Sequence, residues 1–332
     1  MASPYPAGPD VNAGCIADAV AGERSGPVDS LTDIRRCAKR WAGSGKVVMA
    51  GSRAAAPTPV PTLSRRHAAG APSARGLLLT LLGECVLTGD GTAWTSAVLD
   101  VLGRLGVEEK ATRQALMRTA AAGWLAAEKH GRRTRWRLTG SARQLLSDGA
   151  ERIYSFTGPA EDWDGRWLLI YARVPESDRR ARHVMRTRLN WAGFGSLGAG
   201  LWISPHPSRA GEAVGVLEAA GLAGDAHVFV ATRSGLADVR VMVADAWDLA
   251  AIEEQYERFI EEFRARAPAD PLARLIELVH AWRRFPSIDP VLPRELLPAQ
   301  WSGLAAAQLF ADRRQRWSAD ARLDWKRLND IG

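Results

Sequence analysis

The chain has 332 residues, 46% hydrophobic and 24% charged, a composition typical of a soluble globular protein with two or three domains. The net charge of +7 favours a polyanionic partner, either nucleic acid, an anionic membrane or a phosphorylated ligand. The chain carries three widely spaced cysteines, no secretory signal and no apolar run of about 18 residues, which excludes a disulfide-rich secreted protein and a membrane-spanning one and predicts a cytoplasmic protein.

Residues 1–72 differ in composition from the rest of the chain. They are rich in Ala, Gly, Pro and Ser and include the run PTPVP at 57–61. Such a segment buries too little apolar surface to offset its ordering entropy, so we expect it to be disordered. The alternative is an over-extended start, with translation beginning at Met49.

Residues 73–155 have the order of elements found in a winged helix. Apolar residues at helical spacing predict helices over 74–88, 94–105 and 108–122, separated by glycines. A hairpin follows, with strands at 124–129 and 133–139, and then a helix over 140–153. In a winged helix the third helix enters the major groove of DNA, so this order predicts a DNA-binding domain.

The third helix and the hairpin concentrate positive charge. Residues 74–155 hold twelve Lys and Arg against eight Asp and Glu. On the second strand, Thr134, Trp136 and Leu138 alternate with three arginines, so one face packs and the other is cationic. Arginine and glutamine match the hydrogen-bonding edges of bases, and lysine and arginine neutralise phosphates. We predict that the major groove is read or held by Lys110, Thr112, Arg113, Gln114 and Arg118, and the flanking backbone or minor groove by Arg132, Arg133 and Arg135.

The middle of the chain has the βαββαβ order of a ferredoxin-like domain. Its predicted elements are a strand at 166–174, a basic helix at 177–192, strands at 194–198 and 200–204, a helix at 208–221 and a strand at 226–232. A further apolar strand at 239–244 is expected at the sheet edge.

The last region is predicted to be helical. Helices are expected over 248–267, 271–284 and 302–327, and the prolines between 286 and 298 predict an extended turn. Their apolar stripes are typical of a core or a dimer interface.

Several ordered segments resemble the PaaX family of regulators, named for the phenylacetate-degradation repressor. The first helix and the recognition helix resemble it at 73–83 (SARGLLLTLLG) and 111–116 (ATRQAL), and the wing at 123–125 (GWL) and 131–139 (GRRTRWRLT). The middle region resembles it at 152–156 (RIYSF), 163–167 (WDGRW), 191–195 (WAGFG) and 200–205 (GLWISP), and the C-terminal region at 282–290 (WRRFPSIDP) and 296–298 (LLP). The resemblance covers roughly 73–327, and residues 1–72 have no counterpart.

The resemblance implies an α+β multidomain fold. It comprises a winged helix over 73–155, a ferredoxin-like dimerisation and sensing domain over 160–246 that is similar to a small CRISPR-associated nuclease, and a helical domain over 247–332. It also implies a homodimeric repressor of an aromatic or acyl-CoA catabolic operon, bound to double-stranded operator DNA and released by an acyl-CoA thioester such as phenylacetyl-CoA. DNA binding needs no cofactor on this interpretation.

An acyl-CoA effector would need cations for its phosphates and an apolar slot for its acyl arm. The basic helix and the tryptophans after it predict an effector site at Arg182, Arg186, Trp191, Phe194 and Trp202. The competing interpretation, which the pattern favours, is that the arginines form a solvated face and the aromatic residues fill the core. Arg283 and Arg284 are a second candidate pair.

Two other functions are compatible with the same elements. A metal-dependent nuclease of this fold needs an acidic ligand at the end of its first strand, where Arg173 stands instead, although Asp178 follows shortly after. The other alternative is an acyl-CoA-binding protein whose winged helix contacts proteins. We therefore expect no enzyme, no catalytic residue and no metal ligand.

Overall fold

The computed structural model describes residues 73–156, 163–235, 238–264 and 268–331, and these form an α+β arrangement with two small sheets. The predictions for 1–72, including a start at Met49, lie outside the described residues. Within the described ranges, no helix combines the length and the apolar character needed to cross a membrane.

The first three predicted helices are confirmed. They are α2 (Ala74–Leu81), which continues into the π-helical turn η1 (Leu82–Val86), α3 (Thr95–Arg104) and α4 (Glu109–Ala121). Ser73 begins α2 as an N-cap, because its hydroxyl accepts a hydrogen bond from the Gly76 amide at 3.0 Å. Between η1 and α3 lies a three-residue strand, β1 (Thr92–Trp94), that the sequence did not predict.

The predicted hairpin is also confirmed. Strands β2 (Leu125–His130) and β3 (Arg133–Leu138) pair antiparallel, and β1 joins them in the sheet order β1-β3-β2. Trp136 and Leu138 are buried while Arg133 and Arg137 are exposed, so the alternation along β3 holds. Gly131 turns the chain with a φ of 62°, a conformation that favours glycine. The predicted helix that follows is α5 (Gly140–Tyr154), capped by the Thr139 hydroxyl.

The middle region contains the predicted βαββαβ unit. Its elements are β4 (Arg166–Ala172), α6 (Arg179–Trp191), β5 (Gly195–Gly198), β6 (Leu201–Ser204), the short turn η2 (Pro207–Arg209), α7 (Ala210–Ala219) and β7 (Ala226–Thr232). The strand order β5-β6-β4-β7, with every pair antiparallel, is the ferredoxin-like order. One face of the sheet packs against α6 and α7, and part of the other packs against the segments 239–249 and 292–301.

The predicted strand at 239–244 is wrong, because this segment forms helix α8 (Val239–Ala246). The carboxylate of Asp238 accepts a hydrogen bond from the Arg240 amide at 2.9 Å and caps the helix. Val239, Met242 and Val243 then recur at helical spacing and pack on the sheet. As a consequence, β7 is left at the sheet edge with β4 as its paired strand.

The three predicted C-terminal helices are confirmed, although they begin and end at slightly different residues than predicted. They are α9 (Leu249–Glu262), α10 (Pro271–Trp282) and α12 (Gly303–Ile331). The extended turn expected between 286 and 298 instead contains two short helices, α11 (Phe285–Ile288) and η3 (Arg294–Leu296). Pro286 is compatible with α11 because it lies in the first turn, where its missing N–H is not needed.

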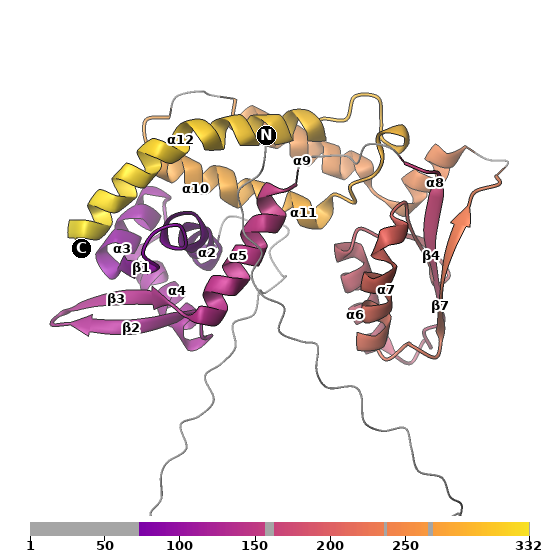
Figure 1. The fold of residues 1–332 in the computed structure, drawn as a ribbon, viewed down its shortest axis with the longest axis horizontal. Coiled ribbons are helices and arrows are strands. Elements are labelled where there is room, and N and C mark those ends of the chain that lie inside the picture. The colour runs from indigo at the N-terminus through magenta and orange to yellow at the C-terminus, as the bar shows by residue number, and fades with distance from the viewer. Residues whose placement is uncertain (1–72, 157–162, 236–237, 265–267, 332) are drawn as a thin grey trace, which may run out of the picture. The chain divides into compact units, whose positions relative to one another are not determined.

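One hydrophobic core joins the first helices of the chain to the last. Helix α12 runs alongside α10 and continues past α3 (Figure 1). The centre of this core is aromatic. The ring of Trp282 stacks on that of Phe310 with their centroids 4.6 Å apart, and the ring of Tyr256 stacks on that of Phe285 with their centroids 4.2 Å apart. Since Trp282, Phe285 and Tyr256 are fully buried, these side chains stabilise the fold.

Candidate nucleic-acid interface

Helix α4 has one buried face and one polar exposed face. Thr112, Ala115, Leu116 and Thr119 are buried, and the helix packs against α2 and α3. The opposite face presents four side chains suited to phosphates and base edges, namely Lys110, Arg113, Gln114 and Arg118, together with the apolar side chain of Met117. The helical spacing of small and apolar residues therefore explains why these polar side chains share one surface.

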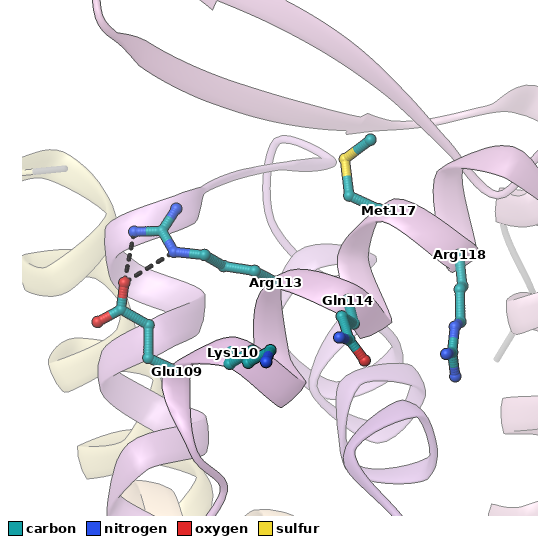
Figure 2. A pocket seen from close by; sticks show the side chains of 6 residues that line it. All are labelled: Glu109, Lys110, Arg113, Gln114, Met117 and Arg118. Atoms are coloured by element: carbon teal, nitrogen blue, oxygen red, sulfur yellow. Dashed lines mark hydrogen bonds and ion pairs between the residues drawn. The ribbon is translucent and has the colours of Figure 1, made fainter.

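The exposed face of α4 borders an open hollow of about 740 Å³, lined by Glu109 and the same five residues. Because all six lining residues belong to one helix, this hollow is open space between side chains on the surface of α4, unlike the enclosed site of a small ligand. Figure 2 shows Lys110, Gln114 and Arg118 projecting from the helix without touching one another. This exposed face of α4 is therefore suited to an extended, solvent-exposed partner.

Arg113 is held by a neighbour on the same helix. Its guanidinium lies 2.7 Å from the carboxylate of Glu109, one turn earlier (Figure 2). Both side chains are more than half exposed, and ion pairs of this kind contribute only about 0–1 kcal/mol. A phosphate or a guanine edge could therefore replace Glu109 at little energetic cost.

On the hairpin, Arg133 and Arg135 pack against Trp94 of β1. Their guanidinium carbons lie 4.6 Å and 5.6 Å from the centroid of the Trp94 ring, and the Nη2 of Arg135 lies 2.6 Å from the carboxylate of Asp90. These contacts orient both arginines on the outer side of the hairpin. Arg132 stands at the exposed tip beside Gly131, and no ion pair involves it among the described residues.

Arg135 and Arg137 of the hairpin are paired with acidic side chains. Burial alone would raise the pKa of Asp90, but hydrogen bonds from Thr92 and the charges of Arg135 and Arg137 outweigh it and lower the pKa. A hydrogen bond from Arg137 likewise lowers the pKa of Glu128, whose carboxylate lies 2.5 Å away. Arg137 thus forms its ion pair within the hairpin. The cationic surface of the hairpin therefore consists of its tip and the side that packs against Trp94.

The end of α12 supports this unit, a contribution that sequence reasoning missed. The amide of Asn329 accepts a hydrogen bond from the Trp94 backbone N–H at 2.9 Å and donates one to the Thr92 carbonyl at 3.2 Å. Arg133 also donates to the Ile331 carbonyl at 3.0 Å. These hydrogen bonds join residues more than 190 positions apart in the sequence. No local sequence pattern could therefore have revealed them.

The inclusion of Thr112 among the DNA-contacting residues is corrected by the structure. Its side chain is 0% exposed and lies on the packing face of α4, so it has no access to a ligand on the outer face. The remaining predicted residues on α4 share the exposed face, and Arg132, Arg133 and Arg135 lie on the hairpin.

The residues predicted for an effector site have different surroundings in the structure. Phe194 and Trp202 are buried in the core between the sheet, α6 and α7, which corrects their assignment to a ligand slot. Arg182 donates hydrogen bonds to the carbonyls of Pro175 and Glu176. Arg186 is exposed, and Trp191 is half-buried at the end of α6. A hollow of about 590 Å³ lies elsewhere, between α8, the start of α9 and residues 296–299.

Four further positions singled out in the sequence have the following surroundings in the structure. Arg284 lies over the Phe285 ring at 5.4 Å, and burial lowers the pKa of Arg283. Asp178 caps α6 by accepting a hydrogen bond from the Ala181 amide at 2.9 Å, and Arg173 donates to the Tyr171 hydroxyl at 3.2 Å. Among the described residues, no three His, Cys, Asp or Glu side chains are grouped as a metal site would require.

Family models for three successive regions match this chain. The PaaX-like protein model matches residues 73–142, the PaaX protein central Cas2-like domain matches 160–243, and the PaaX-like protein C-terminal domain matches 247–327. The chain belongs to the PaaX family. The resemblance inferred from the sequence motifs is thereby confirmed, and the βαββαβ unit corresponds to the Cas2-like domain of PaaX proteins.

Individual relatives agree with this assignment. The transcriptional repressor PaaX of Escherichia coli (strain K12) is 33% identical over 267 residues, which cover 76% of this chain and 83% of the relative. A solved structure, that of the uncharacterized protein Rv0674 from Mycobacterium tuberculosis, is similar in fold with a TM-score of 0.56 and 23% identity, over 77% of this chain and 100% of that one.

Proposed function

We propose that this PaaX-family protein is a transcriptional repressor of an aromatic or acyl-CoA catabolic operon, phenylacetate catabolism being the foremost case. It binds double-stranded operator DNA as a homodimer. The proposal draws on the 33% identity to the Escherichia coli repressor and on the order of α2, α3, α4 and the β2–β3 hairpin, which is the order expected of a winged helix.

The observation that carries the proposal is the one-sided face of α4. Lys110, Arg113, Gln114 and Arg118 project from a helix whose other face is buried, and the cationic hairpin follows directly in the chain. In a winged helix this face enters the major groove, where arginine and glutamine match guanine and adenine edges. Arg132, Arg133 and Arg135 would hold the flanking phosphates or the minor groove.

The release signal that fits this proposal is an acyl-CoA thioester such as phenylacetyl-CoA. Such a ligand would favour a dimer whose two α4 helices no longer match the spacing of the operator half-sites. Of the residues predicted for the effector, Arg186 offers an exposed cation on α6 for the phosphates.

A fluorescence-anisotropy titration of the full chain against its own promoter tests the proposal. We expect the promoter to bind at least 1,000-fold more tightly than a scrambled duplex, on the order of the specificity of known repressors, and phenylacetyl-CoA to release it. Arg118→Ala should weaken promoter binding, while Arg180→Ala, which removes an exposed arginine from α6, should not. Equal affinity for promoter and scrambled DNA at several salt concentrations would contradict the repressor.

A further inference from the structure

The outer edge of the four-stranded sheet is unusually open to pairing with another strand. Strand β7 pairs with β4 on one side and is the last strand in the order β5-β6-β4-β7. Its seven residues, AHVFVAT, include no Asp, Glu, Lys, Arg or Pro. Soluble proteins normally protect an edge of this length with charges, prolines or bulges, because unpaired N–H and C=O groups invite a second strand.

The same strand exposes large apolar side chains. Phe229 is 55% exposed and lies on the same face of the sheet as Tyr171 of β4, which is 36% exposed, while Val230 is 51% exposed on the opposite face. Helix α8 packs on the β5 side of the sheet and leaves Phe229 and Tyr171 uncovered. An edge strand without Asp, Glu, Lys or Arg therefore exposes large apolar side chains on both faces of the sheet.

From these features we infer that β7 pairs antiparallel with β7 of a second copy of this chain, with Phe229 at the two-fold axis, and so joins two four-stranded sheets into one. The flanking charges support this partner and this register. Pairing about Phe229 sets Val228 opposite Val230 and Asp225 opposite Arg233 of the second copy, twice by symmetry. Opposite charges and β-branched pairs are favourable across antiparallel strands.

Asp225 and Arg233 are available for this contact. Both are exposed, and no salt bridge among the described residues involves either of them. The interface specifies how the two copies of the proposed homodimeric repressor would associate. It rests on that proposed function only in that the dimer would bind the two half-sites of an operator. Its existence in solution can be tested without DNA.

A charge exchange measured by sedimentation equilibrium tests the interface and its register. The wild-type chain should sediment at twice its 36.0 kDa mass. Asp225→Arg and Arg233→Asp each place like charges opposite one another and should each raise the dimer dissociation constant by about tenfold, and the double exchange should restore it. A monomeric wild type, or a double exchange no tighter than the single variants, would overturn the inference.

A pair of matched valine substitutions separates the interface from a general effect on folding. Val230→Lys on β7 should raise the dissociation constant by about a hundredfold, since it places a charge within the paired strands. Val241→Lys, at a 57% exposed position on α8, should leave the mass and the unfolding temperature unchanged. If Val230→Lys remains dimeric like Val241→Lys, β7 is not the interface.

Two additional readouts make the result independent of DNA binding and of stability. Phe229→Cys, in a background with Cys15 and Cys37 changed to serine, should form a disulfide-linked dimer on mild oxidation, because the two-fold axis brings position 229 against itself. Absence of that dimer would contradict the register. Binding of the monomeric variants to a single half-site is measured separately, so that loss of DNA binding with an intact dimer contradicts the proposed function alone.

Discussion

The two sheets of this protein have edge strands of opposite character. Strand β2 carries Glu128, Lys129 and His130 on an edge of the hairpin sheet, whereas β7 carries no acidic or basic residue other than His227. Charge on an edge strand discourages pairing with a second strand, and its absence permits such pairing. On the proposed function and interface, the hairpin would stay single and accessible to DNA, while the ferredoxin-like sheet would be the part that associates.

Aromatic side chains of the two sheets are also buried differently. On β3, Trp136 packs inward with 5% exposure, and its indole N–H donates to the Thr95 hydroxyl at 3.0 Å. On β7, Phe229 points outward with 55% exposure. Aromatic residues in the two sheets thus have different roles, one within a core and one on a surface.

The largest expected effect is a difference in the free energy of unfolding between variants of those two aromatic residues. Trp136→Ala should reduce the free energy of unfolding by about 3–5 kcal/mol, because it leaves a cavity and removes a buried ring. Phe229→Ala should change the stability of the isolated subunit by no more than about 0.5 kcal/mol. Urea denaturation at low protein concentration measures both values, and similar losses for the two variants would remove the distinction between core and surface.

A smaller effect is expected where α12 supports β1. Asn329→Ala removes two hydrogen bonds to the backbone of Thr92 and Trp94 and should cost about 1–2 kcal/mol. Amide exchange should show faster exchange at Trp94, whose N–H loses its acceptor. Asp330→Ala, at an exposed neighbouring position on α12, is the matched control and should leave this exchange unchanged.

Acid should weaken the hairpin through Asp90. Its pKa is lowered in the folded protein, so its ionised form stabilises the fold above the ordinary aspartate pKa of about 3.9, and this contribution is lost as the pH falls through the lower folded value. Unfolding can be followed by near-ultraviolet circular dichroism at pH values between 6 and 2. The free energy of unfolding should depend less on pH for Asp90→Asn than for the wild type. Identical profiles would mean that the pair with Arg135 contributes nothing measurable.

The smallest effect concerns the acidic residue on the exposed face of α4. Glu109→Gln removes a negative charge 2.7 Å from Arg113 and should tighten promoter binding by about two- to fivefold, as expected for an exposed ion pair. The matched control is Glu108→Gln, which changes a neighbouring exposed glutamate that forms no salt bridge among the described residues. Anisotropy titrations compare the promoter affinities of the two variants. Weaker promoter binding by Glu109→Gln than by the wild type would mean that this carboxylate helps to position Arg113 for DNA.

The sequence predicted most of the fold where the periodicity was strong. The alternation of Trp136 and Leu138 with arginines fixes both the hairpin and its buried face. The run at 239–244 misled because valine-rich segments favour strands, although the Asp238 cap and the spacing of apolar residues over α8 were signals of a helix. Strand β1 is too short for any pattern, and it forms through pairing with β3.

The candidate site was predictable where exposure follows from helical phase. Lys110, Arg113 and Arg118 were found because they lie opposite the packing face of α4, and the same phase would have excluded Thr112. Phe194 and Trp202 were misassigned, since an aromatic residue has the same sequence signature in a core as in a ligand slot. Asp90 and Asn329 escaped notice because their roles depend on tertiary contacts.

The central claim, that the α4 face contacts DNA, is tested most directly by the salt dependence of promoter binding. The slope of the logarithm of affinity against the logarithm of salt concentration should be smaller by about one for Lys110→Ala than for the wild type, because one phosphate contact is lost. Arg180→Ala on α6 should keep the wild-type slope. Equal slopes for all three proteins would contradict the claim.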